Sequence, residues 1–376
     1  MKVARFDLVR MGAVARKEAL QLSRDRRSLL LAFALPMLLL VLFGYAISWD
    51  VRDITLAVVD QDRSARSRAL IEAFESSGYF SIVARPDAPA AIPELFARRE
   101  ALAVLVIPPG FAADLGRGRP ASVQAVVDGS DANTATIASG YAEAVARDFG
   151  AGVVLAGREM QVPLAAESRV WWNEELLSRN MIVPGLIAVI MMIIAALLTS
   201  LTVAREWERG TMEQLAATPV GRLEIVLGKL LPYLVIGFFD VVLCAVVGAY
   251  LFGVPFRGSA LLLAGLSLLF LTGSLGLGLF ISAATRSQVL ATQVAMIATF
   301  IPAFLLSGFM FAIEVMPKPL QLVTLLVPAR YFLVVTRGIF LKGVGAEVLW
   351  VQALLMILFA TVGLALAVGR FRKELD

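Results

Sequence analysis

Residues 181–204 decide the fold, and they read MIVPGLIAVIMMIIAALLTSLTVA. The stretch is twenty-four residues long and carries no charge. A helix of about twenty apolar residues crosses the roughly 30 Å of hydrocarbon in a bilayer. The segment therefore predicts a membrane-spanning helix.

Five further segments share this character, and together they predict an α-helical polytopic membrane protein. The six expected spans are 29–48, 181–204, 230–252, 261–285, 289–313 and 348–369. Of the 376 residues, 59% are hydrophobic and 17% charged, whereas soluble domains average about 45–50% apolar and about 25% charged. The net charge of +4 is too small and too dispersed to indicate a nucleic-acid surface.

Two further segments are expected to be associated with the membrane without crossing it. Segment 314–342 is interrupted by Lys318, Arg330 and Arg337, so its uncharged pieces are too short, and we expect interfacial or re-entrant helices. Residues 1–28 are expected to form an amphipathic, elbow-like cytoplasmic helix on the anionic leaflet. A solvated basic tail is the alternative for residues 1–28.

The placement of Lys and Arg predicts that both termini are cytoplasmic. With the amino terminus inside, the cytoplasmic segments hold sixteen basic residues and the short outer segments hold five. The other thirteen lie in the long loop between the first two spans, and long loops translocate largely regardless of charge. We therefore expect a multi-pass protein of a bacterial inner (cell) membrane with this loop outside.

Residues 49–180 differ in kind from the spans. The part between 50 and 179 carries 13 basic and 18 acidic residues. Short apolar runs at 54–59, 79–84, 101–107 and 122–127 predict strands separated by helical stretches. This alternation predicts a small α/β extracytoplasmic domain inserted between the first two spans, ahead of a membrane domain over 181–376.

A polar segment after the second span reads REWERGTMEQLAATP over residues 205–219. Gly210 suits the position after a helix end. Thr211 and Gln214 match a capping box, and Thr218-Pro219 matches another helix start. We expect a short cytoplasmic helix at 211–218, which a cytoplasmic partner could push as a rigid body. An ordinary capped loop is the alternative.

Missing residue types argue against catalysis by this chain. It has no histidine and one cysteine, Cys244, so Ser–His and Cys–His catalysis and cysteine-cluster metal sites are excluded. A G-x-x-x-x-G-K-[ST] phosphate-binding loop is also missing. Asp60 and Asp62 are interpreted as caps of the following helix rather than metal ligands. We expect no cofactor, no metal and no enzyme activity.

Three polar residues within spans are candidates for a translocation pathway. Asp240 is the one charge in a span, and a carboxylate at mid-bilayer costs about 2.5–3.5 kcal/mol on insertion scales. It could contact a cationic substrate or a proton, or remain neutral and hold helices together. Thr292 and Gln293 could line the pathway or join neighbouring helices.

Motifs along nearly the whole chain resemble those of ABC-2 type exporter permeases. The central set is Glu206-x-Glu-Arg-Gly-Thr-x-Glu-Gln-Leu, Thr218-Pro219, Arg222, Gly228-Lys229 and Pro232-Tyr233. Segments 57–64 and 127–133 resemble the branch with a large domain between spans one and two. The region before the last span agrees through Ser307-Gly308-Phe309, Met316-Pro317, Pro328, Arg337-Gly338 and Lys342-Gly343. Ala312 departs from the proline common in relatives.

The resemblance implies a permease that exports a hydrophobic or amphipathic, drug-like or lipid-like substrate. It implies a homodimer or a dimer with a close paralogue, a cytoplasmic ATP-binding cassette subunit that holds ATP and Mg, and an optional periplasmic membrane-fusion adaptor. Helix 211–218 would be the coupling helix. The implied ATPase-coupling residues are Glu206, Glu208, Arg209, Gly210, Thr211, Glu213, Gln214, Leu215, Thr218 and Pro219.

Three other classes of protein remain as alternatives. A membrane-anchored sensor or adaptor would use the α/β domain to bind a ligand or partner, but it does not need six spans. An intramembrane enzyme needs more polar groups within the spans than Asp240 supplies. A secondary transporter usually carries inverted repeats, and none is detected.

Overall fold

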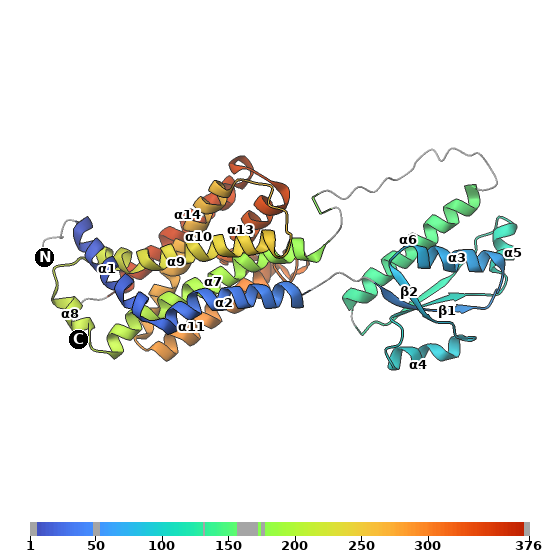
Figure 1. The fold of residues 1–376 in the computed structure, drawn as a ribbon, viewed down its shortest axis with the longest axis horizontal. Coiled ribbons are helices and arrows are strands. Elements are labelled where there is room, and N and C mark those ends of the chain that lie inside the picture. The colour runs from blue at the N-terminus through green and yellow to red at the C-terminus, as the bar shows by residue number, and fades with distance from the viewer. Residues whose placement is uncertain (1–5, 48–52, 131, 156–171, 174–176, 372–376) are drawn as a thin grey trace. The chain divides into compact units, whose positions relative to one another are not determined.

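The computed structural model describes residues 6–47, 53–130, 132–155, 172–173 and 177–371. The chain forms two compact units, one made of Met1–Ser48 with Val170–Asp376 and the other of Trp49–Arg169 (Figure 1). The helices of the first unit are α1 (Leu8–Arg24), α2 (Arg26–Ala46), α7 (Ser178–Glu208), α8 (Met212–Ala217), α9 (Arg222–Tyr250), α10 (Ala260–Thr285), α11 (Gln288–Ile301), α12 (Lys318–Thr324), α13 (Pro328–Arg337) and α14 (Ala346–Arg370).

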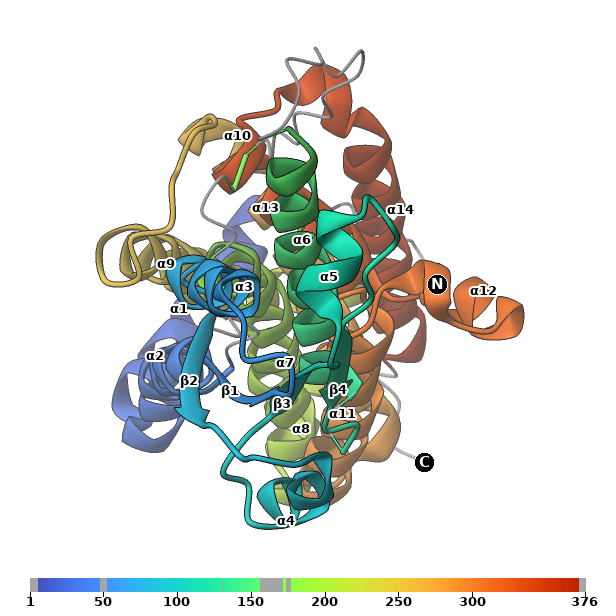
Figure 2. The same cartoon turned by 90° about the vertical axis from the view of Figure 1, so that its right-hand side faces the viewer.

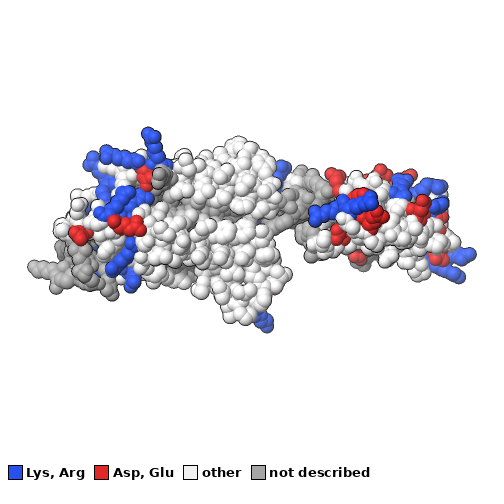
Figure 3. Space-filling model, turned by 90° about the horizontal axis from the view of Figure 1, so that it is seen from below, with Lys and Arg blue, Asp and Glu red and all other residues white. Residues whose placement is uncertain are grey.

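Six helices of this unit are long and apolar enough to span a membrane. They are α2, α7, α9, α10, α11 with its π-helical extension Pro302–Leu306, and α14. In Figure 3 the middle of the unit is almost free of charged side chains, which gather at the end that carries α1. The prediction of an α-helical polytopic membrane protein with an inserted α/β unit is confirmed.

Helix α7 is the centre of the bundle. In its apolar stretch 89% of the residues are buried, compared with 22% in α14, and it packs against α2, α9, α10, α11 and α13. Small residues allow close approach, as is common between membrane helices. A Cβ atom on Gly278 of α10 would lie 2.3 Å from the carbonyl oxygen of Ala196 in α7.

The fifth span is shorter than the predicted 289–313. Helix α11 ends at Ile301, and a π-helical turn covers Pro302–Leu306. Proline lacks an N–H and its ring clashes with the preceding turn, so the α-helical hydrogen bonds cannot continue unchanged. Gly308 then takes a left-handed conformation with φ of +86°. The predicted spans 181–204 and 230–252 lie within the longer helices α7 and α9.

The segment between the last two spans forms a bent pair of helices. Helix α12 and the stretch Pro328–Lys342, made of α13 and the π-helical turn Gly338–Lys342, meet at 79°. The bend falls at Val327, whose extended backbone is the conformation favoured before proline. Neither helix reaches the length of a full span.

The second unit is a four-stranded sheet with helices on both faces. Its strands are β1 (Ile54–Asp60), β2 (Phe80–Ala84), β3 (Ala103–Ile107) and β4 (Gln124–Val127), in the order β2-β1-β3-β4. Strand β1 is parallel to β2 and β3, and β4 is antiparallel to β3. The helices are α3 (Ala65–Ser76), α4 (Ile92–Ala97), α5 (Phe111–Gly116) and α6 (Ala132–Leu155). Figure 2 shows α3, α5 and α6 on one face and α4 on the other.

Helix α5 was not expected from the sequence. It begins after Gly110, and the Asp62 carboxylate accepts hydrogen bonds from the backbone N–H groups of Gly110 (2.8 Å) and Ala112 (3.2 Å). Asp62 therefore caps α5 from a distant loop, whereas Ser64 caps α3. Asp62 was predicted to cap α3, the helix that follows it in the sequence. This prediction was wrong, because Asp62 caps α5.

Candidate functional site

Helix α7 ends in a turn that requires glycine. Gly210 has φ of +67°, in the left-handed region that residues with a Cβ rarely adopt. The N–H of Gly210 donates to the Trp207 carbonyl (3.2 Å), and the N–H of Thr211 donates to the Glu206 carbonyl (3.1 Å). These bonds satisfy carbonyl groups at the helix end. The interpretation of Gly210 as a helix-end residue agrees with this geometry.

Helix α8 lies between the ends of the second and third spans. Met212 is buried and anchors it, while Glu213 and Gln214 are exposed and Leu215 is half-buried. The predicted capping box is wrong: the Thr211 hydroxyl donates to the Glu206 carbonyl (3.4 Å) and makes no cap bond. Thr211 has helical backbone angles, whereas a capping residue is extended.

Helix α9 starts later than Thr218-Pro219 predicted. It begins at Arg222 after Gly221, whose N–H donates to Oε2 of Glu224 (2.7 Å). The Thr218 hydroxyl instead donates to the Leu215 carbonyl (2.7 Å) and closes the end of α8. Oε1 of Glu224 also accepts a hydrogen bond from the N–H of Asp7 (2.7 Å), just before α1. The start of α9 is therefore bonded to the start of α1.

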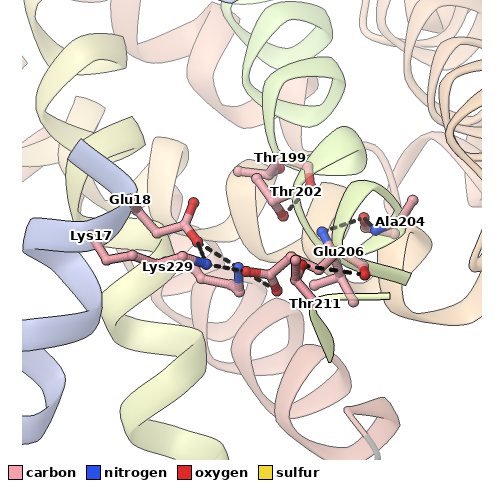
Figure 4. A network of polar contacts seen from close by, with 10 residues as sticks. Lys17, Glu18, Thr199, Thr202, Ala204, Glu206, Thr211 and Lys229 are labelled. Atoms are coloured by element: carbon pink, nitrogen blue, oxygen red, sulfur yellow. Dashed lines mark hydrogen bonds and ion pairs between the residues drawn. The ribbon is translucent and has the colours of Figure 1, made fainter. Parts of the chain in front are cut away.

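Four charged residues from three helices form a buried charge network, which we define as Lys17 and Glu18 of α1, Glu206 of α7 and Lys229 of α9 (Figure 4). Nζ of Lys229 lies 2.6 Å from Oε1 of Glu18 and 2.8 Å from Oε2 of Glu206. Nζ of Lys17 contacts Oε1 of Glu206. The network has no net charge, since two ammonium groups face two carboxylates.

Three members of the network are almost fully withdrawn from water. The side chain of Lys229 is 1% exposed and those of Glu18 and Glu206 are 4% exposed, while Lys17 is 47% exposed. Burial alone would lower the pKa of Lys17, but the carboxylates of Glu206 and Glu18 outweigh burial and raise it. Removal of one partner from a buried ion pair is strongly destabilising, because the other charge stays buried and unpaired.

The expectation that Glu206 lies on the surface offered to an ATPase is wrong. The Glu206 side chain is buried, and Lys17 of α1 and Lys229 of α9 bind its carboxylate. Helix α1 packs directly onto α9, and a Cβ atom on Gly228 would lie 2.7 Å from Cβ of Val14. Sequence reasoning missed Lys17 and Lys229 as partners of Glu206, and it missed Glu18 as the second carboxylate that binds Lys229. A signal was present, because Glu18 falls on the apolar face of α1 between Ala15 and Leu22.

Glu208 joins the end of α7 to the start of α11. Its Oε1 atom accepts a hydrogen bond from the backbone N–H of Gln288 (2.7 Å), and its other oxygen contacts the Gln288 side chain. Nearby, the Arg286 guanidinium lies 4.3 Å from the centroid of the Trp207 ring. Among the predicted coupling residues, three charged or amide side chains are exposed and form no hydrogen bond or ion pair with other described residues. They are those of Arg209, Glu213 and Gln214.

The candidate pathway residues are not brought together. Asp240 is fully buried in α9, and neither carboxylate oxygen has a hydrogen-bond partner within the described part of the chain. Thr292 donates to the Gln288 carbonyl in its own helix (2.8 Å), and Gln293 is exposed on α11. Both α9 and α11 pack on α7. Among the described residues, no group of three or more Cys, Asp or Glu could hold a metal ion.

These features define a multi-pass membrane permease. Residues 26–368 match the family described as ABC-2 family transporter protein, and the chain belongs to this family. It is 37% identical to the probable multidrug ABC transporter permease YbhS of Escherichia coli (strain K12), over 98% of both chains. It is 30% identical to the probable multidrug ABC transporter permease YbhR of the same strain, over 97% of this chain and 99% of that one.

Another relative is the inner membrane transport permease YhhJ of Escherichia coli (strain K12), which is 28% identical over 90% of this chain and 93% of its own. The chain is therefore a permease subunit of an ABC exporter and a multi-pass inner membrane protein. Permeases of this kind work with a separate cytoplasmic ATP-binding subunit, which carries the ATPase. Family membership excludes the sensor, enzyme and secondary-transporter alternatives.

Proposed function

We propose that α8 is the coupling helix, through which the ATP-binding subunit moves this permease. The observation that carries the proposal is the setting of α8. It exposes Glu213 and Gln214, anchors itself through the buried Met212, and is joined at both ends to spanning helices. A partner that binds the exposed side chains would move α7 and α9 together.

The buried charge network would extend that movement to α1. Glu206 lies on α7 and Lys229 on α9, on either side of α8 in the chain, and both bind residues of α1. The Asp25–Arg205 ion pair (2.7 Å) adds another bond between the end of α1 and α7. Helix α2 follows α1 and leads into the α/β unit. Pushing α8 would therefore displace the first span as well as the second and third.

The proposed orientation rests on the distribution of basic residues. We propose that both termini and α8 are cytoplasmic and that the α/β unit is extracytoplasmic, because sixteen Lys and Arg residues lie in the inner segments and five in the short outer ones. Reporter fusions at residue 120 and at the carboxyl terminus should give opposite signals. Matching signals would contradict this topology.

The assembly is proposed to contain two permeases. Two distinct permeases of one bacterial strain resemble this chain over nearly its whole length, which fits either a homodimer or a dimer with a close paralogue. A periplasmic membrane-fusion adaptor is a further proposed partner, since the α/β unit would be available on that side. ATP and Mg would be held by the partner ATPase.

The proposed substrate is hydrophobic or amphipathic and drug-like or lipid-like. Two relatives are named as probable multidrug permeases, and most of the spanning helices are uncharged. Asp240, Thr292 and Gln293 are the proposed polar contacts. The unpartnered Asp240 carboxylate could contact a cationic group on a substrate, because burial leaves a carboxylate in need of a donor or a counter-charge.

The exposed side chains of α8 give the direct test. Glu213→Ala with Gln214→Ala should leave folding nearly unchanged, because surface substitutions usually alter stability by less than about 0.5 kcal/mol. The double variant should nevertheless lose transport and co-purify poorly with the ATP-binding subunit. Glu347→Ala, an exposed glutamate in the first turn of α14, is the matched control. A double variant that binds its ATPase and transports normally would refute the coupling role of α8.

A further inference from the structure

An apolar groove runs between α1, α2 and α9 and has a volume of about 460 Å³. Its walls include Ala19 of α1, Leu29 of α2, and Leu231 and Val235 of α9. Leu231 is 44% exposed and Val235 is 64% exposed. Since both lie in a membrane-spanning helix, the groove opens toward lipid hydrocarbon. Its volume and apolar walls suit an acyl chain.

The rim of this groove is basic. Arg16 and Ser23 of α1 are its polar lining residues. Arg26, at the start of α2, precedes the lining residue Leu29 by three positions and therefore lies on the same face of the helix. Arg16 and Arg26 are both exposed, and neither forms an ion pair within the described part of the chain. Judged from the described residues, the rim thus offers two guanidinium groups without an ion-pair partner beside an apolar groove.

The opposite side of α1 has a different character. A hollow of about 630 Å³ there is lined by polar and charged side chains, among them Arg24, Arg205 and Arg209. Apart from Leu20, the side chains that line that hollow are polar or charged, so its basic groups do not adjoin a continuous apolar wall. Helix α1 therefore separates a mainly polar hollow from an apolar groove, and the groove is the better match for an anion with an attached acyl chain.

We propose that the α1–α2–α9 groove binds one anionic glycerophospholipid from the leaflet at the α1 end of the spans. An acyl chain lies along Ala19, Leu231 and Val235, and the phosphate lies between Arg16 and Arg26, whose bidentate guanidinium groups suit phosphate oxygens. A zwitterionic lipid would bind more weakly, because its ammonium group would be repelled by the same arginines. The proposal rests on the membrane fold and not on the coupling role of α8.

Such a lipid would help to hold α1 against α9. Ala15, Ala19 and Leu22 line the groove from the same helix that supplies Lys17 and Glu18 to the buried charge network. A bound lipid would fill the space between α1 and α9 on their outer side. It would oppose separation of α1 from the span that carries Lys229.

The test measures binding of dioleoylphosphatidylglycerol and dioleoylphosphatidylcholine to the purified full-length chain by native mass spectrometry. The wild type should prefer phosphatidylglycerol. Arg16→Gln should weaken phosphatidylglycerol binding about fivefold, since one basic residue near an anionic lipid contributes about 1 kcal/mol. Arg16→Gln with Arg26→Gln should abolish the preference. Val235→Trp, which fills the groove, should weaken binding of both lipids.

Controls separate this site from general surface charge. Arg24→Gln removes an arginine of the same helix that faces the polar hollow, and it should leave the lipid preference unchanged. Arg16→Lys should retain part of the preference, because it keeps the charge but loses the bidentate geometry. A thermal unfolding scan checks that each variant is folded. An equal loss in Arg24→Gln, no effect of Val235→Trp, or equal competition by inorganic phosphate would each overturn the proposal.

Discussion

The Oγ atom of Ser282 in α10 lies 2.9 Å from the backbone nitrogen of Ala204 in α7 and accepts its hydrogen bond. The same oxygen accepts a hydrogen bond from the N–H of Val203 (3.0 Å). One side chain therefore engages two successive backbone groups of α7, half a turn before Glu206. The end of α7 is thus bonded to α10 on one side and to α1 and α9 on another.

Removal of this contact should destabilise the bundle. Ser282→Ala removes the hydrogen bonds that join α7 to α10 at this point, and a typical intramolecular hydrogen bond contributes about 0.5–1.5 kcal/mol to stability. Ser267→Ala is the matched control, because Ser267 is equally buried in α10 but donates only to a carbonyl of its own helix among the bonds described. Thermal unfolding in detergent should show a larger loss for Ser282→Ala. Equal losses would contradict the assigned role.

Neutralising both an ammonium group and a carboxylate of the buried charge network should reduce the free energy of unfolding less than neutralising the ammonium group alone. Lys229→Met should destabilise the protein by about 3–5 kcal/mol, because Glu18 and Glu206 stay buried without their shared counter-charge. Adding Glu206→Gln should recover part of that loss. Lys318→Met, at an exposed position, should have little effect. Denaturant unfolding of the purified chain measures all three, and additive losses in the double variant would argue against the network.

Substitutions at two glycines test whether α1 depends on its close packing against α9. Gly228→Leu should displace α1, since a Cβ there would meet Val14 at 2.7 Å. Gly12→Leu should be tolerated, because nothing lies within 4 Å of a Cβ at that position. Limited proteolysis near Arg24 should become faster only in Gly228→Leu. Equal protection of both variants would mean that α1 does not need the close contact with α9.

Asp240→Asn should leave assembly and basal ATPase activity of the transporter largely intact, because the amide keeps the size of the side chain. If the carboxylate contacts a cationic substrate, transport of cations alone should fall. Transport assays with one cationic and one neutral substrate of similar size separate the two readings. An equal loss for both substrates would support a structural role in helix packing.

The cap of α5 should depend on pH. The Ser64 hydroxyl and the N–H groups of Ala112 and Gly110 hold the pKa of Asp62 below its usual 3.8. A lowered folded-state pKa stabilises the unit above the unfolded value, and that contribution is lost as pH falls through the lower folded value. Hydrogen exchange in residues 110–116 should therefore be slow at pH 5 to about 7 and faster near pH about 3, relative to intrinsic rates. Asp62→Asn should lose this dependence; an unchanged profile would contradict it.

Sequence reasoning predicted the fold well because the main signals are local. Uncharged runs gave the spans, and alternating apolar runs gave the sheet. The misses depend on contacts between distant segments. Helix α5 is capped by Asp62, 48 residues away from Gly110, and the shortened fifth span depends on how the chain turns after Pro302.

The sequence predicted where the short helix α8 lies in the chain, but it did not predict which partners the neighbouring charged residues bind. A short helix between α7 and α9 could be expected from Gly210 and the flanking spans. The burial of Glu206 could not, since its partners Lys17 and Lys229 lie 189 residues before it and in the next span. The contact of Glu208 with the start of α11 likewise joins residues that lie 80 positions apart in the sequence.

The buried charge network also has a consequence for biogenesis. Helix α1 leaves the ribosome well before α9, since Lys229 follows Glu18 by 211 residues. At about 5–20 residues per second, that interval lasts about 10–40 s. During it, Glu18 has no buried counter-charge, and the amphipathic α1 must wait at the membrane surface. Helix α1 therefore reaches its final place only after α9 has been synthesised, and a chain truncated before α9 would leave it undocked.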